Sequence, residues 1–315
     1  MRKFIISDIH GNGNVYKSIM NYLDNISKTD KITLYINGDL IDYGPDSGEI
    51  LLDIKNRIQD NKYKIVYLGG NHELMMHMAL YVSEEKYEEE WCDSGGHITE
   101  DTLLDIYDYD FEKIKQEVDF ISNLKIYQKF EEKLNGKNIL LVHAGSPYIV
   151  LDNCRLRIKH NNVEVNECVW KRKRNPGIMD MFRDSKEIKE ENEKGTNMLG
   201  NINYFTIVGH TPNENKYGYE YDEKQNVLNI DGGNAYYVRG FFECDHTPLV
   251  EIKEEYLEIL TFNNNNEIIY GNYFDGKESK IFSEEELNER RKYLNKELKI
   301  KKLVLNEENI IDYED

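Results

Sequence analysis

Five short apolar runs of the sequence end in side chains that bind metal ions or transfer protons. The first two runs lead into residues 7–12 (SDIHGN) and 37–42 (NGDLID). The other three lead into residues 69–73 (GGNHE), 143–145 (HAG) and 209–212 (GHTP). Open α/β sheets bind ligands at the carboxyl ends of their strands, so we expect these five segments to meet in one site.

The candidate ligands in these segments offer oxygen and nitrogen donors and no sulfur: Asp8, His10, Asp39, Asn71, His143 and His210. Such a set suits Mn, Fe, Zn or Mg better than it suits a cysteine-rich structural zinc site. Six protein ligands are too many for one catalytic ion with open positions, whereas two ions bridged by one carboxylate would share them. A pair of ions about 3.5–4 Å apart holds a bridging hydroxide and stabilises in-line displacement at phosphorus.

The elements that must position these residues alternate between strands and helices in the first half of the chain. Apolar residues at helical spacing predict helices over 14–26 and 47–58. The sequence after about residue 200 is mostly β in character, and the whole pattern indicates an α/β fold. Runs rich in β-branched and aromatic residues predict strands over 3–7, 32–36, 64–68, 138–142, 205–208, 227–230, 236–242 and 256–262.

Composition narrows the class of protein. The chain has 315 residues and a formal net charge of −19, which argues against duplex nucleic acid as a partner, because Lys and Arg supply most of that affinity. We expect a soluble, cytoplasmic protein without a membrane partner, since there is no long apolar run and no secretory signal at the start. The four cysteines lie far apart, which is typical of buried thiols in a reducing compartment.

The last part of the chain is expected to be an appendage. We place a catalytic domain over residues 1–262 and a C-terminal extension over 263–315, beginning with an NNNN linker. A helix is predicted over 283–299, because Ser283 and Glu286 have the spacing of a capping box and a thin apolar stripe follows. We expect this amphipathic helix to pack on the core, with partner binding or self-association as the alternative.

The motifs, taken together, point to a known family. SDIHGN, GDLIDYGPDS, GNHE, VHAG and VGHTP, in this order, resemble the phosphoprotein phosphatase branch of the calcineurin-like metallophosphoesterases, and most closely its bacterial and phage-type members. Diadenosine tetraphosphate hydrolases are neighbouring relatives. The resemblance covers roughly residues 1–245. It implies a central β-sandwich of two mixed sheets flanked by helices, with metals at the strand ends.

The resemblance also implies a role for each site residue. Asp8 and His10 would bind the first metal, and Asp39 would bridge the two metals. His72 would be the general acid, with Asp42 orienting its ring and favouring the imidazolium form. We expect two divalent ions, Mn²⁺ foremost, with Fe, Zn or Mg as alternatives. The second metal would be held by Asn71, His143 and His210.

Phosphate recognition departs from the family at one position. The family motif G-D-x-x-D-R-G has an arginine where this chain has Tyr43, and a phenol offers one hydrogen bond but no charge and no bidentate fork. Arg172, within a basic stretch, matches the second phosphate-binding arginine of the family. We therefore expect substrate contacts from Arg172, Tyr43 and Asn71.

The sequence thus predicts a metal-dependent phosphomonoesterase. Its substrates would be phosphoserine or phosphothreonine in proteins, with phosphotyrosine also accepted in a dual-specificity enzyme, and small aryl phosphates. One alternative is hydrolysis of diadenosine tetraphosphate or of another nucleotide or phosphodiester. A second alternative is a non-catalytic, metal-bound scaffold, which the change at Tyr43 suggests.

Overall fold

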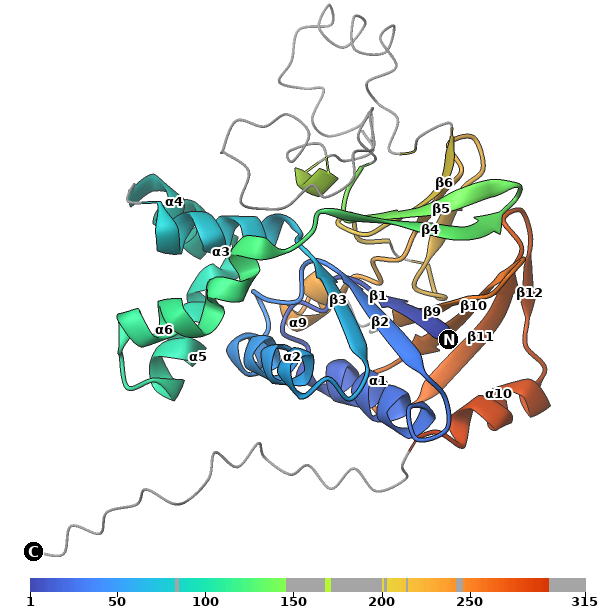
Figure 1. Ribbon diagram of the computed structural model, residues 1–315, viewed down its shortest axis with the longest axis horizontal. Coiled ribbons are helices and arrows are strands. Elements are labelled where there is room, and N and C mark those ends of the chain that lie inside the picture. The colour runs from blue at the N-terminus through green and yellow to red at the C-terminus, as the bar shows by residue number, and fades with distance from the viewer. Residues whose placement is uncertain are drawn as a thin grey trace, which may run out of the picture.

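Two β-sheets packed face to face form the body of the molecule, and helices cover the outer face of the larger sheet (Figure 1). The computed structural model describes residues 1–82, 85–145, 168–170, 200, 203–213, 215–241 and 246–294. Both sheets contain parallel and antiparallel strand pairs. The predicted fold class, a sandwich of two mixed sheets flanked by helices, is confirmed.

The larger sheet has seven strands. Its three parallel strands are β1 (Arg2–Ile6), β2 (Ile32–Asn37) and β3 (Lys64–Leu68). Its antiparallel strands are β9 (Thr247–Ile252), β10 (Leu257–Phe262), β11 (Ile268–Phe274) and β12 (Ser279–Ile281). The order across the sheet is β12-β11-β10-β9-β1-β2-β3, so the chain returns from residue 247 to pair with its first strand.

The smaller sheet has five strands in the order β4-β5-β6-β8-β7. Strands β5, β6 and β8 run parallel to one another, while β4 and β7 pair antiparallel at the edges. The bounds are β4 (Tyr127–Leu134), β5 (Lys137–Val142), β6 (Tyr204–Val208), β7 (Glu220–Asp222) and β8 (Val227–Asn229).

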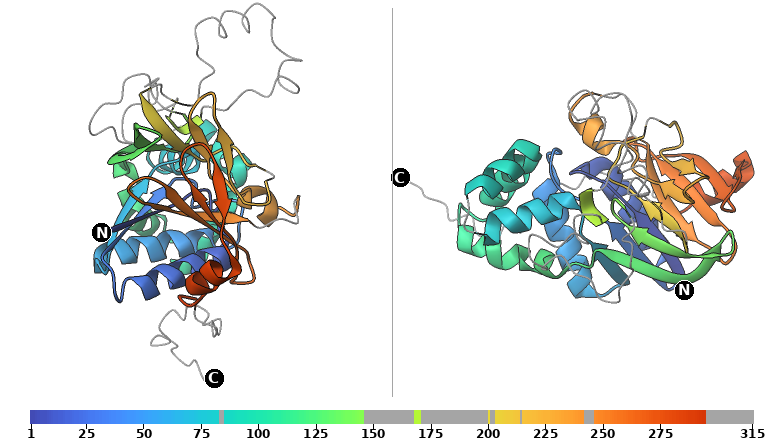
Figure 2. Two further views of the ribbon diagram at one scale, coloured as in Figure 1. Left: turned by 90° about the vertical axis from the view of Figure 1, so that its right-hand side faces the viewer. Right: turned by 90° about the horizontal axis from the view of Figure 1, so that it is seen from above.

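The helices fall into groups by their place in the chain. The two crossover helices of the parallel strands are α1 (Gly13–Ile26) and α2 (Ser47–Asp60). A set of helices between β3 and β4 gathers at one end of the sheets (Figure 2). It comprises α3 (Asn71–Tyr81), α4 (Glu85–Trp91), a π-helical turn (Cys92–Gly96), α5 (His97–Ile106), α6 (Phe111–Val118) and a 3₁₀ turn (Asp119–Asn123). Later in the described part of the chain come α9 (Asn234–Val238) and α10 (Glu284–Arg291).

The core follows from the two-residue period of the strands. Along β1, Phe4 and Ile6 pack with the apolar faces of α1 and α2, whereas Ile5 packs between the two sheets. Phe205 of β6 and Val250 of β9 lie in the same inter-sheet cluster as Ile5. Because successive side chains of a strand point to opposite faces, both faces of β1 are buried, and the apolar run of the sequence reflects this.

Two sequence predictions were wrong. Residues 236–242 do not begin a strand, because Tyr236–Val238 belong to α9, and residues 242–245 lie outside the described part. The NNNN segment is no linker, since it forms the turn of the β10–β11 hairpin, in which Oδ1 of Asn263 accepts from the backbone N–H groups of Asn265 and Glu267. The larger sheet therefore continues across the predicted boundary at residue 262.

The C-terminal helix packs on this sheet. Ser283 and Glu286 form the predicted capping box at the start of α10. Leu287 is buried, and the hydroxyl of Tyr273 in β11 donates to Glu286. The helix ends at Arg291, earlier than predicted, and residues 295–315 lie outside the described part. No helix within the described ranges is long and apolar enough to span a bilayer.

Candidate metal centre and proton donor

All five predicted site segments come together at the carboxyl ends of β1, β2, β3, β5 and β6. Three of these strands belong to the larger sheet and two to the smaller, so the site lies where the two sheets meet. Among the described residues, two groups of side chains have ligand atoms within 4.8 Å of one another: His10, Asp39 and His72, and Asp39, His143 and His210. Asp39 belongs to both groups, which is the position expected of a bridging carboxylate.

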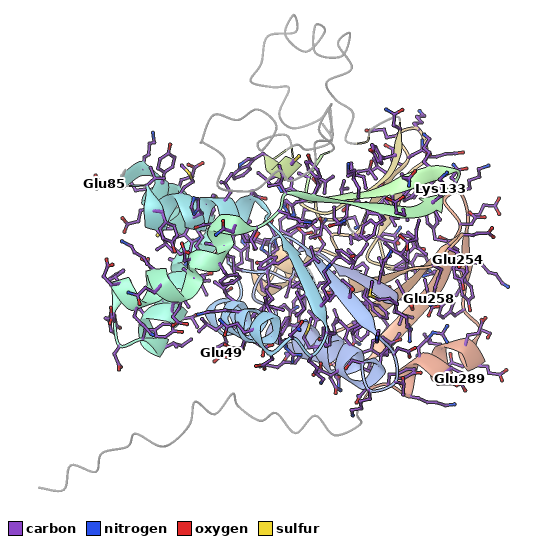
Figure 3. All side chains as sticks on the ribbon, viewed as in Figure 1. Glu49, Glu85, Lys133, Glu254, Glu258 and Glu289 are labelled. Atoms are coloured by element: carbon purple, nitrogen blue, oxygen red, sulfur yellow. The ribbon has the colours of Figure 1, made fainter. Side chains whose placement is uncertain are left out.

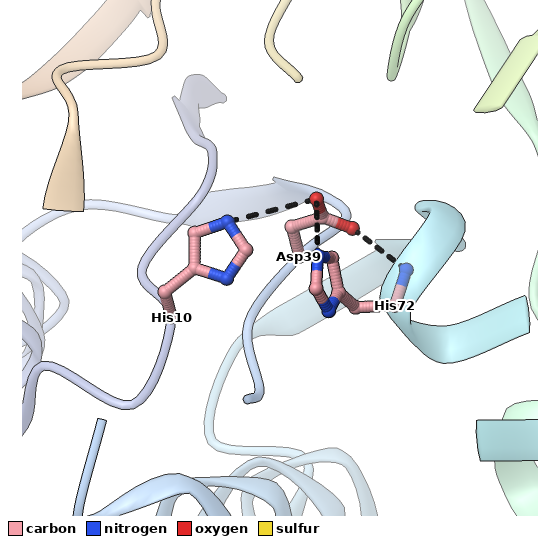
Figure 4. A group of neighbouring side chains, drawn as sticks. All are labelled: His10, Asp39 and His72. Carbon is pink, nitrogen blue, oxygen red and sulfur yellow. Dashed lines mark hydrogen bonds and ion pairs between the residues drawn. The ribbon is translucent and has the colours of Figure 1, made fainter. Parts of the chain in front are cut away.

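The first group gathers around Oδ2 of Asp39 (Figure 4). Nε2 of His10 lies 3.6 Å from this oxygen and Nε2 of His72 lies 3.9 Å from it. Nδ1 of His10 lies 3.1 Å from the carbonyl oxygen of Ile41, to which it donates when protonated. That hydrogen bond leaves the Nε2 lone pair of His10 free for an ion, as is usual for a metal-binding histidine.

The second group faces the same carboxylate from the smaller sheet. Nε2 of His143 lies 3.2 Å from Oδ2 of Asp39, while its Nδ1 lies 2.7 Å from the carbonyl oxygen of Asn37. The backbone thus orients the His143 ring as it orients the His10 ring. Both imidazoles present Nε2 to the space beside Asp39.

The amide of Asn71 points into this space. Its oxygen lies 3.1 Å from Nε2 of His143, and the same position is 2.8 Å from Nδ1 of His210 and 3.1 Å from Oδ2 of Asp39. When the two imidazole nitrogens are unprotonated, as metal ligands must be, these atoms all carry lone pairs. Oxygen facing only acceptors is unfavourable unless a cation lies among them, whereas a rotated amide would donate instead. We favour the oxygen-inward orientation, because oxygen and imidazole donors converging on one point suit a divalent ion.

Asp8 lies beside these groups but belongs to neither. Its Oδ1 accepts from the backbone N–H of His210 at 2.9 Å, and the hydroxyl of Ser7 donates to its Oδ2. Burial and the nearby carboxylate of Asp231 raise the pKa of Asp8 well above its usual value. A cation close to Asp8 would offset both effects. Its role as a ligand of the first metal stays a prediction.

Electrostatics favours the ionised form of the shared carboxylate. Burial alone would raise the pKa of Asp39, but the neighbouring His143 and His72 outweigh it and hold the pKa well below the usual value. Asp39 is almost fully buried. An ionised carboxylate without bulk water around it is a strong ligand for a divalent cation.

Much of the site has a strained backbone. Six of its residues have positive φ angles between 47° and 72°, a region that non-glycine residues seldom adopt. Each such residue costs free energy that the surrounding structure must supply, and strain of this kind clusters at functional sites. The residues are Asp8, His10, Asp39, Asp42, Tyr43 and His210.

A buried glutamate supports this strained turn. Glu73 accepts from the backbone N–H groups of Asp39 and Leu40, both at 2.9 Å, and from that of Gly70 at 2.8 Å. The hydroxyl of Tyr67 also donates to it. Glu73 had no predicted role, although its place three residues after Gly70 is the position of a capping-box acid at a helix start. Gly70 itself is required, because a Cβ there would lie 2.2 Å from Oδ1 of Asp39.

His72 pairs with Asp42, as predicted. Nδ1 of His72 lies 2.7 Å from Oδ2 of Asp42. Burial lowers the pKa of His72, but Asp39 and Asp42 outweigh it and raise the pKa above 6.5. Asp42 is itself held by Nε1 of Trp91 at 3.0 Å and by the hydroxyl of Thr99 at 2.6 Å. Neither donor was predicted, because they come from α4 and α5 and only folding brings them to Asp42.

The predicted substrate-binding residues are placed only in part. The Tyr43 ring lies against His10 and His72, with ring centroids 5.3 Å and 5.2 Å away. Arg172 lies outside the described residues. Trp170, which precedes that segment, is 37% exposed, and its ring centroid is 6.2 Å from that of His210.

Comparison with known proteins decides the family. A model of the calcineurin-like phosphoesterases matches residues 1–240. The chain belongs to this family. Membership and the two groups of candidate ligands identify the protein as a metal-dependent phosphoric ester hydrolase. No curated protein matches the chain.

Several solved structures are similar to this phosphoesterase. One is a cold-active protein-tyrosine phosphatase of a psychrophilic Shewanella species, at 14% identity over 90% of this chain and 80% of that one, with a TM-score of 0.47. Another is a protein serine/threonine phosphatase from Saccharomyces cerevisiae, at 15% identity over 84% and 80%, with a TM-score of 0.42. A third is a putative diadenosine tetraphosphatase, at 15% identity over 83% and 93%, with a TM-score of 0.42.

Proposed function

We propose that this phosphoesterase hydrolyses phosphomonoesters of serine and threonine in proteins, and small aryl phosphates, with two divalent ions of which Mn²⁺ is the foremost candidate. The observation that carries the proposal is the position of Asp39, which lies near His10 in one group and near His143 and His210 in the other, and beside the His72–Asp42 pair. A phosphomonoester needs charge neutralisation at phosphorus and a proton for its leaving group, and the two features suit these two needs.

The ligands for the ions are those that share the buried space beside Asp39. His10 and Asp39 would hold the first ion, with Asp8 added because the family resemblance implies it, and Asp39 would also serve the second ion. Two divalent ions bound there would supply a water-derived nucleophile and neutralise the phosphoryl oxygens. The second ion would take Asn71, His143 and His210.

His72 has the properties of the proton donor. Its Nδ1 is engaged by Asp42, so its Nε2 carries the proton that can be transferred. That atom faces the side of Asp39 where the ligands gather (Figure 4). As the bond between phosphorus and the leaving oxygen breaks, Nε2 gives its proton to that oxygen, and the alcohol leaves neutral. The carboxylates of Asp39 and Asp42 raise the pKa of His72 and so favour its acid form.

Parallel assays test the substrate class. The full-length protein, loaded with Mn²⁺, is given a phosphoserine peptide, p-nitrophenyl phosphate and diadenosine tetraphosphate. We expect the highest kcat/KM on the peptide among the biological substrates. A strong preference for diadenosine tetraphosphate would instead establish the nucleotide hydrolase. The absence of turnover on all three in a verified two-ion sample would support the non-catalytic scaffold.

Two substitutions test the mechanism. Asp39→Asn removes the shared charge, and His72→Asn removes the proton donor. Each should lower kcat by roughly 10²–10⁴-fold. Only Asp39→Asn should also reduce the number of bound ions. Wild-type turnover in a folded His72→Asn protein would exclude His72 as the acid.

A further inference from the structure

An arginine from a distant part of the chain lies against the ring of Tyr43. The guanidinium carbon of Arg239 is 4.9 Å from the Tyr43 ring centroid and 4.7 Å from that of Phe241. Arg239 is exposed, and Phe241 is 63% exposed. The same Tyr43 ring also packs against His10 and His72 of the candidate metal centre. Arg239 thus stands one aromatic ring away from the proposed proton donor.

The backbone around Arg239 is fixed by the end of α9. Arg239 is the C-cap residue, and Gly240 follows it with a φ of 74°. The N–H of Phe241 donates to the carbonyl of Tyr236, and the N–H of Gly240 donates to that of Tyr237, both at 2.9 Å. These two bonds make a Schellman motif, in which the left-handed position favours glycine. The side chain of Arg239 therefore starts from a defined point at the rim of the site.

Arg239 supplies the positive charge and the N–H donors that Tyr43 lacks. A phosphoryl dianion is best bound by a guanidinium, which offers two parallel N–H donors and a permanent charge. Tyr43 supplies neither. An aromatic ring does, however, hold a guanidinium by a cation–π contact and leaves the N–H donors at the edge of the guanidinium free. Among the described residues, Arg239 has no ion-pair partner that would occupy those donors.

We propose that Arg239 binds the phosphoryl oxygens of the substrate, and that the ring of Tyr43 is the platform that holds its guanidinium at the site. The inference rests on the proposed phosphoesterase function and adds a recognition residue to it. It also changes the expected role of Tyr43, because the aromatic face matters more than the phenolic hydroxyl.

Binding of inorganic phosphate tests the proposal apart from turnover. The metal-loaded full chain is titrated with phosphate by isothermal calorimetry, and KM and kcat are measured with p-nitrophenyl phosphate. Arg239→Gln should weaken phosphate binding and raise KM roughly 10- to 100-fold, the loss expected for hydrogen bonds to a charged group. Arg239→Lys should recover part of the loss, since it restores the charge but not the fork.

A matched control removes a positive charge elsewhere. Lys133 is exposed in β4 (Figure 3). Lys133→Gln changes the net charge by the same amount as Arg239→Gln and should leave phosphate affinity and KM unchanged. If the two variants weaken phosphate binding equally, the effect comes from overall charge and the proposal is wrong. Equal thermal unfolding temperatures for the two variants show that the comparison concerns folded protein.

Two substitutions of Tyr43 separate the ring from its hydroxyl. Tyr43→Phe keeps the ring and should retain phosphate affinity, whereas Tyr43→Leu should weaken it as Arg239→Gln does. The double variant Tyr43→Leu/Arg239→Gln should be no weaker than Arg239→Gln alone, because the ring acts through the arginine. A loss in Tyr43→Phe as large as in Tyr43→Leu would assign the role to the phenol and overturn the platform.

The two proposals fail in different ways. A wild-type enzyme that is active, with Arg239→Gln unchanged in phosphate affinity and KM, rejects the role of Arg239 and leaves the phosphatase. A wild-type protein that binds phosphate through Arg239 but hydrolyses no phosphoester rejects the phosphatase and retains the anion site.

Discussion

The carboxylate of Glu73 holds the backbone of Asp39, with its Oε2 2.9 Å from the Asp39 nitrogen. Glu73 lies in the first turn of α3, so the start of this helix and the turn after β2 are joined through one buried side chain. Asp39 has a φ of 52°, and a residue in that region needs such support. The shared Asp39 is therefore positioned by an acid that is fully buried.

Glu73→Gln tests this support. A glutamine can accept from only one side, so its NH₂ group would face a backbone N–H that Glu73 now satisfies. We expect metal affinity and kcat to fall roughly 10- to 100-fold, as for other groups that orient metal ligands. Calorimetry measures the metal affinity, and a turnover assay measures kcat. The control is Glu85→Gln, since Glu85 is an exposed acid at the start of α4 (Figure 3). Wild-type metal affinity in a folded Glu73→Gln protein would contradict the prediction.

Removal of the ions should abolish turnover. Chelation followed by gel filtration should give inactive protein, because without the cations nothing neutralises the phosphoryl group or generates the nucleophile. Added Mn²⁺ should restore activity in proportion to the bound metal, with two ions per chain at full activity. Elemental analysis measures the ratio. Turnover that persists in a verified metal-free sample would disprove this dependence.

Asp42→Asn should move the basic limb of the pH profile. Burial lowers the pKa of His72, and the carboxylates of Asp39 and Asp42 raise it above 6.5. The protonated form is the active acid, so kcat/KM falls as the pH rises through this pKa. Without the charge of Asp42 the pKa of His72 falls, and the limb shifts to lower pH. Asp101→Asn, an exposed change in α5, should leave the limb in place. An unshifted limb in Asp42→Asn would show that another group titrates.

A salt bridge in the larger sheet should control stability in acid. Arg2 donates two hydrogen bonds to Glu251, of 2.7 Å and 2.9 Å, and joins β1 to β9. Burial raises the pKa of Glu251, but Arg2 and Lys253 outweigh it and hold the pKa below 4.5. A lowered carboxyl pKa stabilises the fold above the unfolded pKa, and this stabilisation is lost as the pH falls through the folded value.

Glu251→Gln should therefore cost about 1–3 kcal/mol of unfolding free energy at neutral pH. Below about pH 4.5 the wild type should lose stability more steeply than the variant, so the two curves converge. Urea unfolding between pH 3 and pH 7 measures both. Glu254→Gln, an exposed change before β10, should keep the wild-type pH dependence (Figure 3). Parallel curves for wild type and Glu251→Gln would contradict the assignment.

The sequence was most informative where one strand leads directly into its ligands. The apolar run before Asp39 and the run before His143 each predict a buried strand. The polar residues that follow must then lie at the strand ends. Parallel strands explain why the ends converge within each sheet, and the packing of the two sheets brings the two sets together. The family motifs supplied the same set of residues independently.

The sequence was least informative where a contact joins distant elements or where an aromatic run is ambiguous. Trp91 and Thr99 reach Asp42 from separate helices, and no local spacing records that contact. The aromatic residues around Tyr236 have high strand propensity, yet they form α9, which ends at Gly240 in a Schellman motif. The position of Arg239 follows from that motif, so it could not be predicted from the sequence alone.

The meeting of the two sheets at this site has a mechanical consequence. Asp39 follows a strand of the larger sheet and His143 follows a strand of the smaller sheet. A cation held by both side chains would therefore cross-link the two sheets. A ligand that binds only the folded form stabilises it by mass action, about 2.7 kcal/mol at a concentration one hundred times its Kd. The ions needed for hydrolysis would thus also stabilise the packing of the two sheets. Loss of metal would lower the free energy of unfolding as well as abolish activity.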